Sequence, residues 1–382
     1  MRYKLGDIFD LQMGKTPDRH NPVFWTEGSE PWISIADLSK CDKYIERTSE
    51  CISKEAVEKS GIKVIPQETV IMSFKLSIGK VAITQREMYS NEAIMAFINK
   101  GSLRIEPTYL YYLLLAHEWV NETNKAVMGK TLNKATLSKI KVHIHSLAEQ
   151  QEIICTLDKV SNIISARKQQ LIELDNLVKA RFVEMFESYS SDTVKVGSVF
   201  QAIRNGVSPS TRGTCAVKVL TLSAITQGAF DESAWKRGMF DEPPADDKRI
   251  SKTDLYICRG NGNKELVGTA AYSKHNFPDV VFPDTIIAAR VDTSKICLPY
   301  LFYAWKHPAV RMQIESGART TNGTFKINQK TLSEIEIMLP PLDVQIQFAA
   351  FVNQVDKSKV AVQKALEEAQ LLFDSLMQDY FG

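Results

Sequence analysis

The sequence predicts an α+β fold: two similar heads of mixed α and β structure, separated and followed by long helices that pair as an antiparallel coiled coil in a pseudo-two-fold internal repeat. The segment Lys4–Phe9 (KLGDIF) returns as Lys195–Phe200 (KVGSVF) in a chain of 382 residues. Thr136–Val142 (TLSKIKV) returns as Thr331–Ile337 (TLSEIEI). Solenoid repeats are only roughly 20 to 50 residues long, so this much longer repeat indicates a duplicated head, each copy with its own helix.

The repeat divides the chain into four parts. We expect the first head over residues 1–146 and its helix over 147–190. We expect the second head over 191–341 and its helix over 342–382. Heads of about 150 residues are long enough to bury a core of their own.

Short apolar or alternating runs, bounded by Gly, Pro or polar residues, predict strands at matching places in the two heads. These runs are 31–35, 69–73 and 80–84 in the first head, and 218–222, 254–258 and 269–272 in the second. A proline then opens an aromatic-rich helix in each head, at Pro107 and Pro299. Proline suits the first helical turn, where its missing N–H would have no partner. The aromatic residues that follow are expected in the core.

Apolar residues in the two closing segments recur at alternating steps of three and four. This spacing keeps one helical face against a partner and is typical of a coiled-coil seam. The alternative is that each helix folds separately onto its own head, but the absence of Pro and Gly from Ala148 to Glu187 favours the paired coil. The expected seam residues are Ile153, Leu157, Val160, Ile164, Leu171, Leu174, Val178, Phe348, Val352, Val355, Val362, Leu366, Phe373 and Leu376.

The composition limits the classes of protein to consider. The formal net charge is +2 and is evenly divided between the halves, whereas a protein that coats nucleic acid is strongly basic. DNA binding therefore requires basic residues gathered on one face. The six cysteines form no CxxC pair, which fits a reducing compartment. We expect no signal peptide and no membrane span, and hence a cytoplasmic protein.

The motifs of several enzyme classes are missing. An amino-methyltransferase needs an Asn-Pro-Pro-Tyr or Asp-Pro-Pro-Tyr tetrapeptide to hold the exocyclic amine, and the nearest string is EPPA at 242–245. No GxxxxGK[ST] phosphate loop occurs. His143 and His145 alternate on an expected strand, but no third metal ligand lies near them. We therefore predict no catalytic residue, no metal ion and no cofactor in this chain.

Loops rich in Arg, Lys, Asn, Thr and Gly recur at corresponding places in the two heads. Arg and Asn side chains contact base edges, while Lys, Thr and backbone amides hold phosphates. One such loop alone is usually an exposed turn, but recurrence with different side chains predicts two DNA-reading surfaces for two different half-sites. The candidates are Lys15, Thr16, Lys75, Lys80, Lys125, Lys130, Lys134, Arg204, Arg212, Arg259, Asn261, Asn263, Lys264, Arg319, Thr320, Asn322 and Lys326.

Taken together, these features resemble the specificity (S) subunits of type I restriction–modification systems, the HsdS family, over essentially the whole chain. The resemblance rests on the duplicated plan, on the opening Lys4–Phe9, and on the junction at 137–142, which runs in the second half through 332–337 to the LPPL string at 339–342. The family continues with Glu-Gln, present here as Glu149-Gln150. The second copy departs from this pattern at 343–348 (DVQIQF), and the first copy has Ser-Leu in place of the two prolines.

The resemblance implies two target-recognition domains that each read one part of a bipartite, asymmetric sequence in double-stranded DNA. It implies that the helices fix the length of the unread spacer and dock two methyltransferase (M) subunits, through which restriction (R) subunits attach. S-adenosylmethionine, ATP and Mg²⁺ would bind those partners, and this chain would be non-catalytic. The alternative is a structural adaptor whose heads bind protein. A fused methyltransferase or nuclease would need motifs that the sequence lacks.

Overall fold

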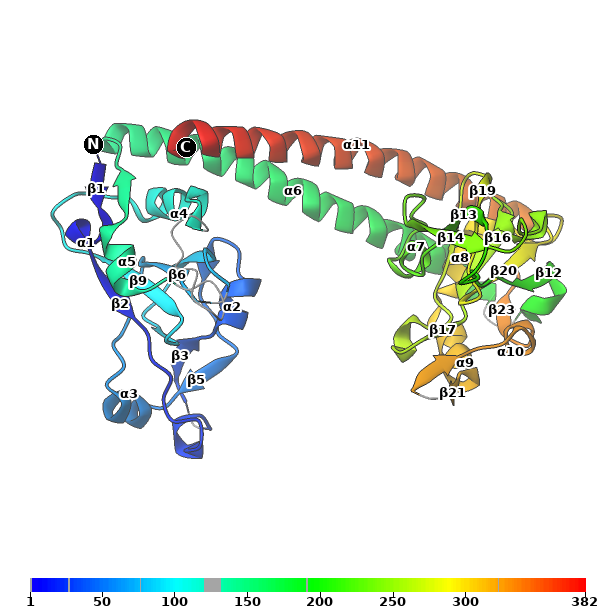
Figure 1. The fold of residues 1–382 in the computed structure, drawn as a ribbon, viewed down its shortest axis with the longest axis horizontal. Coiled ribbons are helices and arrows are strands. Elements are labelled where there is room, and N and C mark those ends of the chain that lie inside the picture. Colours follow the sequence, from blue (N-terminus) through cyan, green and yellow to red (C-terminus); the bar gives the residue numbers. More distant parts are fainter. Residues whose placement is uncertain (1, 27, 76, 120–131, 190–191, 322) are drawn as a thin grey trace. The chain divides into compact units, whose positions relative to one another are not determined.

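The computed structural model describes residues 2–26, 28–75, 77–119, 132–189, 192–321 and 323–382. They form two compact units. Unit 1 contains Met1–Lys168 with Lys364–Gly382, and unit 2 contains Gln169–Gln363. Each unit therefore combines one head with about half of each long helix (Figure 1).

The head of unit 1 is built on a five-stranded sheet in the order β2-β9-β6-β7-β4 and a three-stranded sheet in the order β5-β3-β8. The larger sheet consists of β2 (Phe9–Met13), β9 (Ile94–Asn99), β6 (Val70–Ser73), β7 (Val81–Thr84) and β4 (Tyr44–Ile45). The smaller consists of β5 (Glu50–Ile52), β3 (Glu30–Ile33) and β8 (Tyr89–Ser90). The helices are α1 (Leu5–Ile8), α2 (Ile35–Lys40), α3 (Lys54–Ser60), α4 (Pro107–Ala116) and α5 (Lys134–Lys139). The three expected strands and the helix at Pro107 are all present.

The head of unit 2 contains two four-stranded sheets, β12-β20-β16-β18 and β14-β13-β19-β15. It also contains a three-stranded sheet of β17 (Gly260–Asn261), β22 (Thr324–Lys326) and β21 (Arg319–Thr321). The first consists of β12 (Phe200–Asn205), β20 (Ile286–Val291), β16 (Asp254–Cys258) and β18 (Ala270–Tyr272). The second consists of β14 (Trp235–Phe240), β13 (Cys215–Leu220), β19 (Phe277–Val281) and β15 (Arg249–Ile250). The helices are α7 (Ser223–Thr226), α8 (Leu298–Trp305), α9 (Pro308–Gly317) and α10 (Gln329–Ser333). Pro299 lies in the first turn of α8, as expected.

Both heads begin and end on neighbouring strands. In unit 1, β1 (Arg2–Lys4) pairs antiparallel with β10 (Lys141–His143), and in unit 2, β11 (Thr193–Lys195) pairs in the same way with β23 (Glu336–Met338). A glycine follows the first strand of each pair. An added Cβ would lie 2.7 Å from the Cβ of Ser138 at Gly6, and 3.1 Å from the Cβ of Ser333 at Gly197. The repeated sequence segments are thus the two sides of one contact, which explains why they recur together.

The long helices are α6 (Leu147–Phe186) and α11 (Leu342–Phe381), each of 40 residues. In unit 1 the beginning of α6 packs on the end of α11, where Val160 and Ile164 cluster with Ala369. In unit 2 the end of α6 packs on the beginning of α11, where the ring centroid of Phe186 lies 5.4 Å from that of Phe348. Both contacts require antiparallel helices, which run alongside each other in Figure 1, so the predicted pairing is confirmed.

The expected seam residues face the partner helix or the head beneath it. Ile153, Leu157, Val160, Ile164, Val178, Phe348, Val352, Val355 and Val362 are buried, and Leu171, Leu174, Leu366, Phe373 and Leu376 are half-buried. Lys359 interrupts the apolar series of the second helix. Its Nζ lies 2.5 Å from Oδ1 of Asp175 on α6, so an ion pair between the helices replaces an apolar contact at this position.

A buried glutamine fixes the beginning of each long helix. Oε1 of Gln150 accepts a hydrogen bond from the N–H of Glu106, and its amide group donates to the carbonyl of His145, both at 3.0 Å. Gln345 repeats this arrangement with the N–H of Cys297 and the carbonyl of Pro340, both at 2.8 Å. The second copy therefore keeps the glutamine of the Glu-Gln pair although the sequence around it departs.

Replacing Gln345 by leucine is expected to lower the free energy of unfolding of unit 2 by about 3 kcal/mol, because it leaves a buried N–H and a buried carbonyl without partners. Leucine has a similar size, so little of the loss would come from a cavity. Urea denaturation of the full chain measures the change. The matched control is Gln347→Leu, an exposed site on the same helical turn, where the change should stay within about 0.5 kcal/mol. Equal effects of the two variants would contradict the role of Gln345.

Candidate nucleic-acid interface

The three-stranded sheet of unit 2 joins two of the loops that the sequence singles out. β17 (Gly260–Asn261) pairs with β22 (Thr324–Lys326), which pairs with β21 (Arg319–Thr321). Gly260 lies opposite Lys326, and Lys326 lies opposite Arg319. Residues far apart in the sequence thus form one row across the sheet, which we call the cationic row. In Figure 1 it lies at the end of unit 2 that is farthest from α11.

The cationic row is unfavourable for folding and suited to binding an anion. Arg319 and Lys326 are exposed, and like charges directly opposite each other destabilise an antiparallel pair. Neither has an ion-pair partner among the described residues. Gly260, at the third place of the row, has no side chain, so the row is flat there. An added Cβ at Gly260 would lie 3.1 Å from Cγ of Lys326. A flat surface with two exposed cations fits a phosphate backbone.

The loop that follows β17 has a fixed backbone. The side chain of Asn261 accepts a hydrogen bond from the N–H of Asn263 at 2.8 Å, and the side chain of Asn263 accepts one from the N–H of Glu265 at 3.0 Å. Behind the loop, Arg311 on α9 donates to the carbonyl of Lys264 at 2.9 Å. The loop therefore holds the exposed side chain of Lys264 on a supported frame.

The remaining candidates of the second head lie in different settings. Arg212 is exposed between β12 and β13, and Thr320 is exposed on β21 next to the cationic row. Arg259 is half-buried and donates to the carbonyl of Asp284 at 3.1 Å. Asn322 lies outside the described residues.

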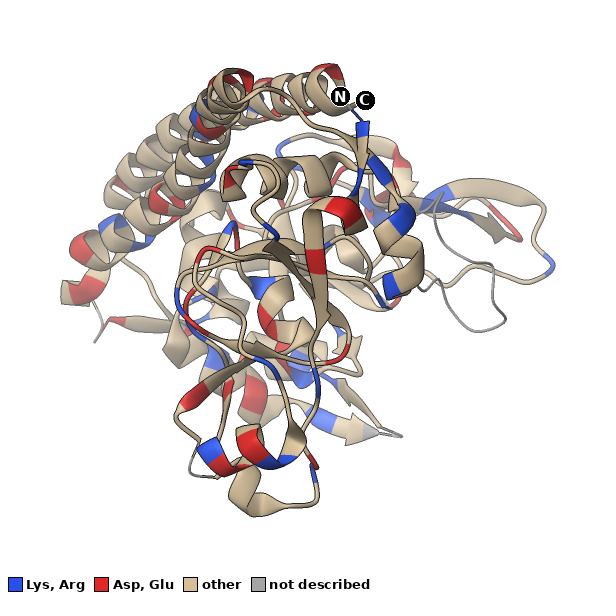
Figure 2. Cartoon of the chain, turned by 90° about the vertical axis from the view of Figure 1, so that its left-hand side faces the viewer, with Lys and Arg blue, Asp and Glu red and all other residues tan. Residues whose placement is uncertain are grey.

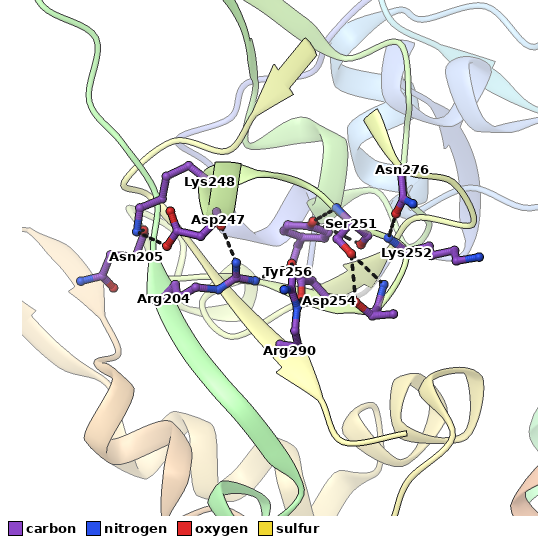
Figure 3. A network of polar contacts seen from close by, with 11 residues as sticks. Arg204, Asn205, Asp247, Lys248, Ser251, Lys252, Asp254, Tyr256, Asn276 and Arg290 are labelled. Carbon is purple, nitrogen blue, oxygen red and sulfur yellow. Dashed lines mark hydrogen bonds and ion pairs between the residues drawn. The ribbon is translucent and has the colours of Figure 1, made fainter. Parts of the chain in front are cut away.

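Arg204 lies inside the head, where it forms part of a charge network (Figure 3). Its side chain is 11% exposed, and its Nη2 lies 2.5 Å from Oδ2 of Asp254, whose side chain is fully buried. Arg290 binds the same carboxylate, with Nε 2.9 Å from Oδ1, and this hydrogen bond raises the pKa of Arg290. Arg204 is therefore largely buried and not on the exposed surface, because the buried carboxylate of Asp254 requires a counter-charge.

The loops that follow β2 and β12 are built alike. An added Cβ at Gly14 would lie 2.2 Å from the carbonyl oxygen of Ser90, and one at Gly206 would lie 2.0 Å from that of Pro283. Only glycine permits this approach. The loops at 14–17 and 206–209 therefore occupy equivalent places in the two heads.

The candidate cations of the first head each contact a different neighbour. Nζ of Lys15 donates to the carbonyl of Ser60 at 2.5 Å, and Nζ of Lys80 donates to the hydroxyl of Ser39 at 2.6 Å. Lys134 pairs with Asp10 at 3.6 Å, Lys75 is half-buried, and Thr16 donates to Glu92. Lys125 and Lys130 lie outside the described residues. Basic and acidic residues are interspersed along the ribbon in Figure 2, and no strand pairing joins these candidates into a row like that of unit 2 among the residues that the structure describes.

Unit 2 has a second basic surface, on β14, that was not predicted from the sequence. β14 begins with the exposed residues Trp235, Lys236 and Arg237. Arg237 lies opposite Lys218 of β13, whose ammonium is 4.7 Å from the centroid of the Trp235 ring. The signal in the sequence was the Trp-Lys-Arg triplet, since an exposed ring beside cations is a common platform for nucleic acid.

Within the described part of the chain, the histidines of the first head do not form a metal site. No group of three or more His, Cys, Asp or Glu residues there is arranged to hold a metal ion. His143 and His145 have ring centroids 4.6 Å apart, but Nδ1 of His145 is 2.7 Å from the hydroxyl of Tyr109. No helix in the described ranges combines the length and the apolar character needed to span a bilayer.

Comparison with known proteins gives relatives for both halves. The family model "Type I restriction modification DNA specificity domain" matches residues 1–176 and again 191–371. The type I restriction enzyme MjaIX specificity subunit of Methanocaldococcus jannaschii is 27% identical over 193 residues, 50% of this chain and 43% of that protein. The StySPI specificity subunit of Salmonella potsdam is 23% identical over 358 residues, 86% of this chain and 75% of that protein. The match thus spans less than half of the first relative's length.

Solved structures agree with the fold. The type I restriction–modification S subunit from M. genitalium has a TM-score of 0.55 at 14% identity, covering 100% of this chain and 96% of that one. A chain from a study of the assembly and conformational transition of a type I R-M system has a TM-score of 0.61 at 16% identity, covering 99% and 96%. At these identities the likeness concerns the fold, whereas the family model matches both halves of the sequence. The chain therefore belongs to the type I restriction–modification DNA specificity domain family and carries two copies of the domain.

Proposed function

We propose that this chain is the non-catalytic, DNA-reading subunit of a type I restriction–modification complex, and that its two heads read the two parts of a bipartite, asymmetric target. Family membership of both halves supports the proposal, as do relatives named as type I specificity subunits. The observation that carries it is the cationic row, where two loops singled out in the sequence meet on one exposed sheet.

Within unit 2 the chemistry of the side chains assigns different roles. Arg319 presents a planar guanidinium that can bind both acceptors of a guanine edge. Lys326 and Lys264 are flexible single charges that suit phosphates. The net charge of only +2 fits a subunit whose sequence-independent affinity for DNA comes largely from its partners.

We propose that the exposed apolar residues of the long helices receive the methyltransferase subunits. In unit 1, Leu371 and Leu372 on α11 are 70% and 51% exposed. In unit 2, Ile172 and Leu177 on α6 are 53% and 49% exposed. Leu371 and Leu372 are adjacent in the sequence, and exposed apolar side chains that lie together mark protein contacts. S-adenosylmethionine, ATP and Mg²⁺ would act in the M and R subunits, and the helices would set the spacer between the half-sites.

Modified bases in host DNA test this proposal. When the chain is co-expressed with its methyltransferase subunit, sequencing for modified adenines should show one split motif with a constant spacer. Binding of the purified complex to that motif should weaken steeply between 50 mM and 200 mM salt, because phosphate contacts release counterions. A complex that assembles but leaves the DNA unmodified would contradict the proposal and favour the adaptor, whose protein contacts should respond little to salt.

A further inference from the structure

Unit 2 contains a cavity of about 640 Å³ between its head and its parts of the two long helices. Four aromatic residues of the head line it: Phe230, Tyr272, Phe302 and Tyr303. The helices add charged residues, namely Asp175 and Lys179 from α6 and Asp356 and Lys359 from α11. A cavity of this size with mainly apolar walls and a few polar groups is typical of a small-molecule site.

The lining of the cavity carries four lysines and the three carboxylates of Asp175, Glu232 and Asp356, and two of the lysines have no carboxylate partner. Lys359 pairs with Asp175 at 2.5 Å, and Lys274 pairs with Asp356 at 2.7 Å. Lys179 and Lys306 also line the cavity, and neither forms an ion pair with any residue in the described ranges. The site therefore carries surplus positive charge.

The ammonium group of Lys306 lies among residues that line the cavity. Nζ lies 3.7 Å from the centroid of the Phe302 ring and donates to the carbonyl of Gly228 at 3.1 Å. Burial lowers the pKa of Lys306 to about 8; Asp175 opposes this shift, while Lys179 and Lys359 add to it. The side chain as a whole remains accessible, so an anion entering the cavity can reach it and offset the repulsion among the lysines.

In unit 1 the lysine beside the equivalent helix, α4, has an acidic partner. There the hydroxyl of Tyr112 donates to Asp158 of α6 at 2.5 Å, and Nζ of Lys43 pairs with the same carboxylate at 2.7 Å. The ammonium of Lys43 lies 5.0 Å from the centroid of the Tyr112 ring. Tyr303 occupies the place of Tyr112 in unit 2, where the lysine lacks such an acidic partner.

We propose that this cavity binds a small planar aromatic anion, with its ring against Phe302 and Tyr303 and its acidic group on Lys306 and Lys179. The ligand would contact the head and both helices of unit 2, so its binding would fasten the head to them. This site is separate from DNA reading: it shares no residue with the cationic row, and it does not depend on the proposed function.

The probe is 1-anilinonaphthalene-8-sulfonate, an aromatic sulfonate whose fluorescence rises in apolar surroundings. Titration of the full chain should show one site per chain. Lys306→Met keeps the aliphatic stem and removes the charge, and it should weaken binding at least about tenfold, because a hydrogen bond to a charged group is lost. Lys357→Met, at an exposed site on α11 that does not line the cavity, is the control and should change affinity less than about twofold.

Two further measurements separate charge from shape. N-phenyl-1-naphthylamine has the same rings without the sulfonate, so its weaker binding should not change in Lys306→Met. Val360→Trp, on a lining residue that is 71% exposed, narrows the cavity without disturbing the core and should weaken both probes. Absence of a single sulfonate site, or unchanged sulfonate affinity in both Lys306→Met and Val360→Trp, would overturn the proposal. Equal affinity for the two probes would overturn its anionic part.

Discussion

Replacing Asp254 by alanine is expected to lower the free energy of unfolding of unit 2 by about 4 kcal/mol, in the range for breaking a buried ion pair from one side. The carboxylate is fully buried and binds Arg204 at 2.5 Å and Arg290 at 2.9 Å. Without it, a guanidinium that is 11% exposed keeps its charge and loses its counter-charge. Hydrogen exchange of the β16 and β20 amides during urea denaturation measures the loss within unit 2.

The matched control is Asp279→Ala. Asp279 also pairs with one cation, Lys218, at 2.7 Å, but its side chain is 58% exposed, so the loss should stay below about 1 kcal/mol. Replacing Asp254, Arg204 and Arg290 together by leucine should restore much of the stability, because an apolar set leaves no unpaired charge. Equal losses in Asp254→Ala and Asp279→Ala would show that the buried network is not a main support of the head.

Replacing Arg319 by alanine is expected to weaken binding of the assembled complex to its target by about 10- to 100-fold, since a bidentate base contact contributes about 1–3 kcal/mol. Preference should relax at one position of the second half-site and stay unchanged in the first. Fluorescence anisotropy with duplexes altered in one half-site at a time measures both effects.

Two variants of the same row distinguish base reading from charge. Arg319→Lys keeps the charge and loses the planar fork, so it should relax preference almost as much as alanine does. Lys326→Ala should weaken all sequences alike and lower the slope of affinity against salt by about one. Equal loss of preference in both half-sites after Arg319→Ala would contradict heads that read independently.

Periodicity in the sequence predicted the repeating parts of this fold well. The steps of three and four gave the paired helices, and short apolar runs gave strands such as β6, β7 and β16. Local patterns succeed there because each element buries one face of regular period. Even Lys359, a break in the pattern, has a physical reason in its ion pair with Asp175.

Pairings between distant loops lay beyond such reasoning. The meeting of Gly260 with Lys326 depends on how the head folds around α9, and no local period encodes it. Arg204 was predicted to contact DNA because the residues next to it in the sequence do not indicate whether its side chain is exposed or buried. The signal lay elsewhere, in Asp254 at the start of a strand that is buried throughout, since a carboxylate in that position requires a cation.

β11 and β23 pair side by side, so the chain between them enters and leaves the second head at one place. We call that stretch the excursion, and the paired strands with the long helices the scaffold. Segments inside the excursion, including both loops of the cationic row, can diverge or be exchanged as a graft without shifting the helix that follows. Gly197, Ser333 and Gln345 hold the base of the head in place, because Gly197 packs against Ser333 and Gln345 binds the N–H of Cys297. Because β1 and β10 give the first head the same attachment, the sequence of one head can change while the other head and the long helices stay as they are.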